Sequence, residues 1–348
     1  MADRTTAEGV TLAHIAARAG TTVPTVSKVL NGRSDVSATM RERVLAIVGE
    51  TGYRRSPRSG AGAPDLDLVD LVISGVEGSW ANLVLSGVER AASAAGLDVV
   101  VMLARDVGPR SWLERLLARP SRGAVLALVS PTSAQLAALG AVAIPIVLLD
   151  PVAAPSADVP SVGASNWAGG YAAGRHLRDL GHRSFAVAAG PIDHLYSQAR
   201  LDGFRSALAA GGIVLDETRV VHSSGGSDTV GLGRLLDAAD PPTAVFACTD
   251  SLALTAYRAA QERGIRIGPE LSIVGFDDLP EAAWVSPPLT TVRQPVADMG
   301  AAALRLLLRL RDEPASAAPA EELATSLVVR ESTAPPLRDR AGKDLLPR

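Results

Sequence analysis

The chain has 348 residues, of which 47% are hydrophobic and 20% charged, and its formal net charge is −3. This length predicts two or three compact units with a sizeable core, and a total charge so close to neutral identifies no partner by itself. The single cysteine excludes an intrachain disulfide, and the sequence has neither an apolar run of membrane-spanning length nor the apolar stretch of a signal peptide. We therefore expect a cytoplasmic protein without a membrane partner.

The first 60 residues differ in charge from the rest of the chain. They hold nine Lys and Arg against five Asp and Glu, whereas the whole chain holds 34 against 37. A basic segment attached to an acidic body indicates a protein that contacts a polyanion at one end.

Three short helices are predicted within this basic segment. Thr11 is expected to cap the first helix and Gly20 to end it. The second helix has Pro24 in its first turn, where the missing N–H has no helical partner. Ser37 is expected to cap the third helix, which stops at Gly52. Two helices joined by a tight turn and closed by a third indicate a helix-turn-helix unit.

Residues 56–67, rich in Ser, Gly, Ala and Pro, are predicted to be a linker. Beyond it, apolar runs alternate with amphipathic stretches, which predicts parallel strands covered by helices on both faces. The number of units favours two doubly wound lobes over one sheet. The predicted strands are 68–74, 97–103, 123–129, 144–150, 184–190, 243–248 and 271–277. After them come a strand at "LTTVRQP", a helix over 296–312, one final strand within 321–332 and a disordered tail over 336–348.

Several blocks of the sequence are similar to a known family. "TVSKVLNG", "VSATMRERV" and "TGY" belong to the basic segment. Further blocks follow in order along the body, among them "SNWAGG", "ARLDGF", "FACTDSLALTAYRAAQERG", "VGFDDLPEA" and "SPPLTTVRQP". On these blocks the chain resembles the lac repressor (LacI/GalR) family of bacterial transcription regulators over nearly its whole length.

The resemblance implies how the chain is divided and how it works. It implies a helix-turn-helix DNA-binding domain over 1–55, an atypical hinge over 56–67, and a two-lobed effector-binding and dimerisation domain over 68–335. Members of the family bind palindromic double-stranded operator DNA as homodimers, and a small effector, here expected to be a sugar, binds between the lobes. The expected fold class is an all-α head plus an α/β body of two doubly wound lobes, resembling a periplasmic sugar-binding protein.

In a helix-turn-helix unit, the second helix enters the major groove and its N-terminal side chains contact base edges. Val23 offers apolar contact to a thymine methyl, and Lys28 can reach guanine acceptors. The polar and basic side chains around them are expected on phosphates, where they position the protein. The expected DNA-binding set is Thr22, Val23, Pro24, Thr25, Ser27, Lys28, Asn31, Arg41 and Arg54. The alternative is a helical protein-interaction domain with a solvated basic face.

A sugar site needs side chains that bridge neighbouring hydroxyls and flat apolar faces for the C–H side of the ring. The resemblance puts Arg200 and Asp277 on effector hydroxyls, and Asp277 also ends a predicted strand, where ligands of open α/β sheets bind. Two alternatives stay open, since Asp277 can cap the next segment and Trp80 can anchor its own helix. The expected effector-binding set is Trp80, Asn166, Trp167, Arg200, Thr249, Asp277 and Gln294.

Residues next to this set have simpler expectations. Asn166 either caps its helix or touches the effector, and Thr249 stands where relatives often carry Asn. Asp250 is expected to be the N-cap of the helix that follows. His182 is expected to be a helix-exit residue, and Cys248 a small core residue.

Motifs of common enzyme classes are missing from the sequence. It has no G-x-x-x-x-G-K-[ST] phosphate loop, no G-x-G-x-x-G after a strand and no G-x-S-x-G elbow, and "GLGRLL" falls inside a predicted helix. The five histidines have no metal-ligand spacing, so neither a metal nor a cofactor is expected. We therefore expect a regulator and not an enzyme that carries a DNA-binding head.

The class of effector is a separate question. The alternative to a sugar is a purine or acid corepressor acting on the same architecture, for which a cationic lobe face is expected. Near the matched positions only Arg200 is clearly cationic, beside the carboxylate of Asp277, and that balance favours neutral polyols.

The hinge sequence departs from the family pattern. Most relatives form a hinge helix on DNA and wedge a leucine into the minor groove, whereas Gly62 stands at that position here. Gly60 and Pro64 also disfavour a helix. We expect no wedge and little operator bending. We also expect a dimer and not a tetramer, because the C-terminal tail has no apolar heptads.

Overall fold

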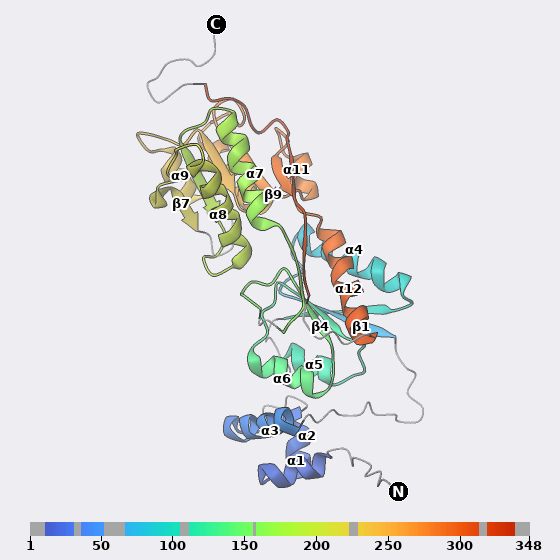
Figure 1. Ribbon diagram of the computed structural model, residues 1–348. Coiled ribbons are helices and arrows are strands. Elements are labelled where there is room, and N and C mark those ends of the chain that lie inside the picture. The colour runs from blue at the N-terminus through green and yellow to red at the C-terminus, as the bar shows by residue number, and fades with distance from the viewer. Residues whose placement is uncertain are drawn as a thin grey trace.

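The protein consists of a three-helix head followed by two α/β lobes, arranged one after another along the molecule (Figure 1). The expected fold class is confirmed. The computed structural model describes residues 11–30, 36–51, 67–104, 111–155, 158–222, 229–312 and 319–337. The expectations for Asn31, Gly52, Arg54, the hinge over 56–66 and the tail beyond 337 lie outside these described residues.

The head forms the predicted helices with the predicted caps. The Thr11 hydroxyl accepts a hydrogen bond from the amide three residues on, and Gly20 ends the first helix with φ of +66°, which glycine adopts without a steric penalty. The Ser37 hydroxyl accepts from the amide of Met40 in the same way. The helices are α1 (Leu12–Ala19), α2 (Val23–Leu30) and α3 (Ala38–Thr51).

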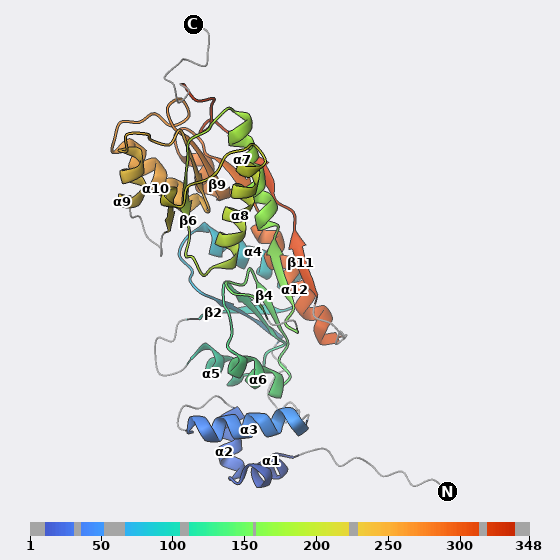
Figure 2. The same ribbon diagram turned by 60° about the vertical axis from the view of Figure 1, so that its left-hand side comes forward.

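The apolar faces of the three helices enclose a small core. Its fully or nearly fully buried side chains are Ile15, Ala16, Ala19, Val26, Val29, Leu30, Val44, Ile47 and Val48. Ala141 of the first lobe is buried in the same cluster. The head therefore rests on the first lobe, with α3 beside α6 (Figure 2).

The first lobe is built on a six-stranded parallel sheet of order β11-β5-β4-β3-β1-β2. Its central strands β1, β3 and β4 are short apolar runs that are buried on both faces, as is typical of parallel sheets. The strands are β1 (Leu68–Ile73), β2 (Asp98–Leu103), β3 (Ala124–Ala127), β4 (Ile146–Leu149), β5 (Ser161–Ala164) and β11 (Ala320–Leu323).

The second lobe repeats this plan with the order β12-β10-β9-β8-β6-β7, in which only the β10–β12 pair is antiparallel. The strands are β6 (Phe185–Ala189), β7 (Val220–His222), β8 (Ala244–Ala247), β9 (Ser272–Asp277), β10 (Thr290–Arg293) and β12 (Ser326–Val328).

Helices cover both faces of each sheet. Along β1, Leu71 and Ile73 pack with α4 and α12, whereas Val72 packs on the other face with α5 and α6, because successive strand side chains point to opposite faces. In the second lobe, α7 and α8 cover one face, and α9 and α10 the other. These helices are α4 (Ser79–Ala94), α5 (Trp112–Leu117), α6 (Ser133–Ala141), α7 (Asn166–Asp179), α8 (Leu195–Ala209), α9 (Val230–Leu236), α10 (Asp250–Gln261), α11 (Pro280–Trp284) and α12 (Val296–Asp312), with a 3-10 turn at Glu217–Arg219.

The chain passes between the lobes three times: after β5, after β10 and between β11 and β12. The single final strand expected within 321–332 is therefore wrong. The segment forms two short strands, one in each sheet, because the chain changes lobes at residues 324–325. The strands β5 and β7 were not predicted from the sequence, because they are short and not fully buried.

His182 follows the end of α7 as expected, and its backbone N–H donates to the carbonyl oxygen of Leu177 in that helix. Its side chain is in addition a buried anchor. Its Nε2 lies 2.9 Å from the carbonyl oxygen of Ala334, and its Nδ1 lies 2.9 Å from the Thr243 hydroxyl. Since a carbonyl only accepts, Nε2 carries the proton and the ring is neutral with Nδ1 as acceptor. Burial lowers the pKa of His182 to about 4. The ring thereby ties the end of the described chain to the second sheet.

We expect His182 to make the stability of the second lobe depend on pH. Below about pH 6.5 the imidazole binds a proton in the unfolded chain, whereas in the folded protein it binds one only near pH 4. The free energy of unfolding therefore falls as the pH drops through this window. Between pH 7 and pH 5 the loss from this residue is about 2 kcal/mol. Urea unfolding at both pH values checks this. The His182→Gln variant should show a smaller difference, and an equal difference would contradict the assignment.

Candidate functional site

The head presents the N-terminal end of α2 to solvent. The hydroxyls of Thr22 and Thr25 lie 3.0 Å apart, and the Thr25 backbone amide donates to the Thr22 hydroxyl, so Thr22 caps the helix. Val23 is 40% exposed although it is apolar. Of the expected DNA-binding side chains, the exposed ones are Thr22, Val23, Pro24 and Lys28, and the half-buried ones are Thr25, Ser27 and Arg41.

A pocket of about 210 Å³ lies between the two lobes. Its walls follow the carboxyl ends of strands from both sheets, which is where open α/β sheets bind ligands. The first lobe contributes Ser74, Gly75, Glu77, Trp80, Ala81, Leu128 and Asp150. The second lobe and the crossover after β10 contribute Tyr196, Arg200, Thr249, Ser251, Asp277, Leu279 and Gln294.

Backbone strain gathers at this pocket. Leu128, Asp150 and Asp277, each at or just beyond the end of a strand, have φ of +51°, +49° and +115°. Positive φ is costly for residues with a side chain, by about 1–3 kcal/mol each, and such residues cluster at functional sites. The strain turns the chain sharply at the edge of each sheet and aims these side chains between the lobes.

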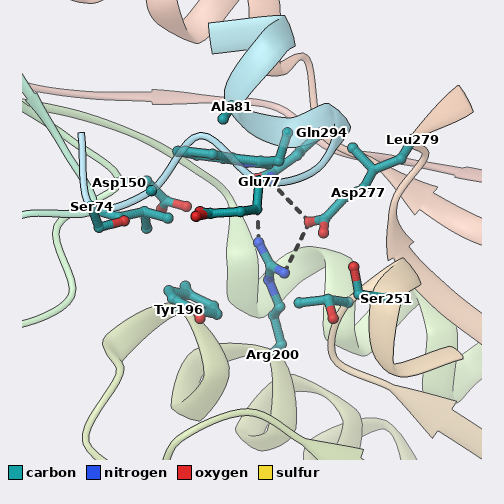
Figure 3. A pocket seen from close by; sticks show the side chains of 14 residues that line it. Ser74, Glu77, Ala81, Asp150, Tyr196, Arg200, Ser251, Asp277, Leu279 and Gln294 are labelled. Atoms are coloured by element: carbon teal, nitrogen blue, oxygen red, sulfur yellow. Dashed lines mark hydrogen bonds and ion pairs between the residues drawn. The ribbon is translucent and has the colours of Figure 1, made fainter. Parts of the chain in front are cut away.

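The Arg200 side chain is 1% exposed, and its guanidinium donates four hydrogen bonds within the second lobe and the crossover after β10. Its Nε donates to Asn166 at 2.8 Å, and its Nη1 donates to the carbonyl of Cys248 at 2.7 Å and to Asp277 at 3.0 Å. Its Nη2 donates to Gln294 at 3.3 Å (Figure 3). The guanidinium also stacks 3.7 Å from the centre of the Phe276 ring, where the ring face attracts the cation.

Two glycines bring Arg200 to this position. A side-chain carbon at Gly170 of α7 would lie 2.0 Å from the carbonyl oxygen of Arg200, and one at Gly203 of α8 would lie 2.0 Å from that of Trp167. Any larger residue at either position would push α7 and α8 apart. The two helices therefore touch backbone to backbone, and Arg200 reaches the strand ends from α8.

Asp277 is the acceptor that the Arg200 network surrounds. It accepts hydrogen bonds from Arg200 and from the amide of Gln294, both at 3.0 Å. Burial raises the pKa of Asp277 to about 7, although Arg200 opposes this rise. Capping is not its role, because the amide of Leu279 at the start of α11 donates to Asp250 instead.

Asp250 supports the pocket from behind. The expectation that Asp250 caps α10 is wrong: Thr249 is the cap, and its hydroxyl accepts from the amide of Leu252. Asp250 is the first helical residue and accepts from Leu279 and from the Thr291 hydroxyl at 2.6 Å. Burial, followed by the nearby Asp277 carboxylate, raises its pKa.

The structure brings together five of the seven expected effector-binding side chains: Trp80, Arg200, Thr249, Asp277 and Gln294. Asn166 lies behind Arg200 and orients it, and the cap of α7 is Ser165. Trp167 departs from expectation. It is 48% exposed, stacks on Tyr171 and does not line the pocket.

Sequence reasoning missed five polar side chains of the pocket wall: Ser74, Glu77, Asp150, Tyr196 and Ser251. A signal existed for Asp150, which ends the apolar run 144–150 in the same way that Asp277 ends its own strand. Burial raises the pKa of the Asp150 carboxyl, and Arg200 and Asn166 partly oppose the rise. Glu77 lies in the turn between β1 and α4, where the sequence gives no strong signal.

The described residues contain no group of three His, Cys, Asp or Glu side chains that could hold a metal ion. Within the same residues, no helix has the length and apolarity that crossing a membrane requires. Cys248 is buried as expected, and burial raises the pKa of its thiol to about 12.

Comparison with known proteins agrees with this geometry. Residues 11–56 match the family described as bacterial regulatory proteins, lacI family, and residues 175–333 match a periplasmic binding protein-like domain. The chain is 30% identical over 329 residues to the ribose operon repressor of Haemophilus influenzae. The aligned region covers 92% of this chain and 98% of the relative. The chain belongs to the lacI family. It is a DNA-binding transcription regulator, and its relatives are transcription regulators and not enzymes.

Two solved structures of lacI-family proteins share its fold. The transcriptional regulator CelR–cellobiose complex superposes with a TM-score of 0.70 and 32% sequence identity. The match covers 93% of this chain and 99% of the CelR chain. The lac repressor dimer bound to operator and the anti-inducer ONPF superposes with a TM-score of 0.66 and 28% sequence identity. The match covers 94% of this chain and 100% of the lac repressor chain.

We expect Arg200→Met to destabilise the second lobe of this lacI-family protein by about 3–5 kcal/mol near pH 8, because it leaves the Asp277 carboxylate buried without a counter-charge. The loss should shrink toward about pH 6, where Asp277 takes up a proton, and the Asp277→Asn change should rescue part of it. Urea unfolding measures these values. Arg258→Met on exposed α10 is the control, with a change of about 0.5 kcal/mol or less. A pH-independent loss would contradict the role given to Asp277.

Proposed function

We propose that the protein is a transcription repressor whose binding to operator DNA is controlled by a small sugar held between the two lobes. The observation that carries the proposal is the interlobe pocket, where Arg200, Asp277 and Gln294 form one hydrogen-bonded group beside Trp80. Sugar sites combine such groups with flat apolar faces. We assign DNA binding to residues 1–55, linkage to 56–67, and effector binding and dimerisation to 68–335.

The DNA-binding part of the proposal rests on α2. Val23 and Lys28 are exposed on this helix, and they offer an apolar contact for thymine and a cation for guanine. The lac repressor relative is a dimer bound to operator in its solved structure. We propose the same for this chain: two heads on one palindromic site, in the cytoplasm, and without enzymatic activity.

The effector part of the proposal rests on the chemistry of the pocket wall. Carboxylate, amide and hydroxyl groups from both lobes face a volume of about 210 Å³. Drug-sized ligands occupy roughly 300–1,000 Å³. The smaller volume favours a monosaccharide, whereas the CelR relative binds cellobiose in its solved structure.

An acid corepressor on the same architecture fits this wall less well. Glu77, Asp150 and Asp277 all line the pocket, and each of these carboxyls repels an anionic ligand when it is ionised. A purine remains the second candidate, since Trp80 and Tyr196 offer aromatic surface. Sugars and purines placed side by side in one thermal-shift screen separate the two.

We expect Lys28→Ala to weaken operator binding by about 1–3 kcal/mol and to relax the sequence preference. Operator binding by the wild type and by the variant should fall steeply with ionic strength, because each head neutralises several phosphates. Gel shifts with the native promoter and with a mutated site measure this at two salt concentrations. Arg90→Ala, which removes an exposed cation from the first lobe, is the control and should behave as the wild type. Full affinity and selectivity in Lys28→Ala would refute the assignment of α2.

We expect Asp277→Asn and Gln294→Ala each to weaken binding of an effector sugar by about tenfold or more, since each removes a partner of the buried network. Operator binding without effector should be retained. The measurement is a thermal-shift screen of mono- and disaccharides, followed by gel shifts with any hit. Asp202→Asn, which changes an exposed carboxylate on α8, is the matched control. Unchanged affinity in both pocket variants would dispose of this pocket as the effector site.

A further inference from the structure

The linker between the head and the body has a sequence that opposes a helix. Gly60, Gly62 and Pro64 each disfavour a helical backbone. The sequence therefore predicts no linker helix that would fix the direction of the head. A direct contact between the head and the body can fix that direction instead.

Helix α6 of the first lobe makes such a contact. Its last residue, Ala141, is 4% exposed and belongs to the apolar core of the head, with Ile15, Val44 and Ile47. Ala141 is the one first-lobe side chain in that core among the described residues. Helix α3 of the head lies beside α6 (Figure 2). Because protein cores are close-packed, a larger side chain at this position has to displace the head.

The same helix is also part of the first-lobe core. Ala138 and Leu139, which directly precede the last turn residues of α6, are 5% and 1% exposed. They pack with Val72 of β1 and Leu148 of β4. The position of the head is therefore tied to the sheet of the first lobe.

The start of α6 is tied to the pocket. This helix connects β3 to β4, and the residues directly after these two strands, Leu128 and Asp150, line the pocket. The two loops are joined, because the Ser130 hydroxyl accepts a hydrogen bond of 3.1 Å from the amide of Ala153. Thr132 then opens α6 with a capping box. The helix thus runs from the edge of the pocket to the head.

The loop after β4 touches the second lobe as well. The carbonyl oxygen of Val152 accepts a hydrogen bond of 2.9 Å from the amide of Leu195, the first residue of α8. Helix α8 carries Tyr196 and Arg200 of the pocket wall. A change in the separation of the lobes would therefore act on this loop, on the start of α6 and, at the other end of α6, on the head.

We propose that α6 sets the direction of each head, so that a dimer reads the spacing of the operator half-sites, and that the lobes alter operator binding by moving this helix. The proposal rests on the proposed function, in which two heads bind one palindromic site. Half-sites of helix-turn-helix dimers have a spacing that follows from the geometry of the dimer. Heads held only by a tether would tolerate several spacings and would bind more weakly, because they are not pre-organised.

Operators with altered spacing test the first half of the proposal. Two base pairs inserted at the dyad of the native operator move one half-site by about 7 Å and turn it by about 70°. In gel shifts at one salt concentration, the wild type should bind this operator about tenfold or more weakly than the native one.

A matched pair of neutral variants locates the effect. Ala141→Gln places a longer polar side chain in the head contact, and it should bind the native operator more weakly and retain a spacing preference of about threefold or less. Ala137→Gln, at an exposed position of the same helix, should behave as the wild type. Ala141 lies outside the first-lobe core, so the body of the variant should unfold at the same urea concentration as that of the wild type. Equal binding of both spacings by the wild type would overturn the proposal, as would a full spacing preference in Ala141→Gln.

A sugar found in the thermal-shift screen tests the second half. It should bind Ala141→Gln as tightly as it binds the wild type, but should change operator binding by the wild type alone. A full response in Ala141→Gln would overturn the coupling through α6. If no sugar changes operator binding by the wild type, the proposed sugar response fails and the coupling fails with it, whereas the spacing comparison judges the direction of the head independently.

Discussion

The Arg200 guanidinium lies almost wholly out of contact with water, and a charge in that position is stable only when every hydrogen-bond partner is in place. Its partners come from four separate segments: Asn166 opens α7, Cys248 follows β8, Asp277 ends β9 and Gln294 follows β10. Each segment reaches the guanidinium from the edge of the second lobe that faces the first. The same hydrogen bonds therefore hold these four segments of the second lobe together and determine the shape of the pocket.

This arrangement also connects the lobes. Gln294 stands in the second crossover, directly before α12, which packs on the sheet of the first lobe. The opposite face of that sheet carries α6, and α6 touches α3 of the head. A second link joins the hydroxyl of Ser79 at the start of α4 to the carboxylate of Glu281 in α11. Packed elements therefore run without interruption from the pocket to the head.

Much of the fold could be predicted from the sequence because buried parallel strands read as continuous apolar runs. The seven long runs each became a strand, and the helix caps Thr11, Gly20 and Ser37 were legible in the head. The strands β5 and β7 could not be predicted in the same way, since each is short and partly exposed. No local signal marks the change of lobe between β11 and β12, because that event depends on the sheet that each strand meets.

The site was predictable only in part, for related reasons. Arg200 and Asp277 lie in blocks that resemble the family, and the structure brings them within 3.0 Å of each other. The placement of Trp167 depends on the rotation of α7, which the close contact of Gly170 with α8 fixes, and that contact joins residues far apart in sequence. Glu77 and Asp150, the two acids that the first lobe contributes to the pocket, stand outside the sequence blocks that resemble the family. Their importance follows from the enclosed volume that they share with Asp277, and that volume exists only in three dimensions.

The three crossovers have a consequence for the order in which the protein folds as it is synthesised. The first lobe needs α12 to cover Val84 and Val88 and needs β11 to complete its sheet, yet both elements belong to the last part of the chain. Domains usually fold as units while synthesis proceeds from the N-terminus. Here the ribosome must release nearly the whole body before either lobe is complete, so the head can fold long before the lobes that are to govern it. Until then, the apolar face of α4 lacks the α12 side chains that cover it in the folded protein.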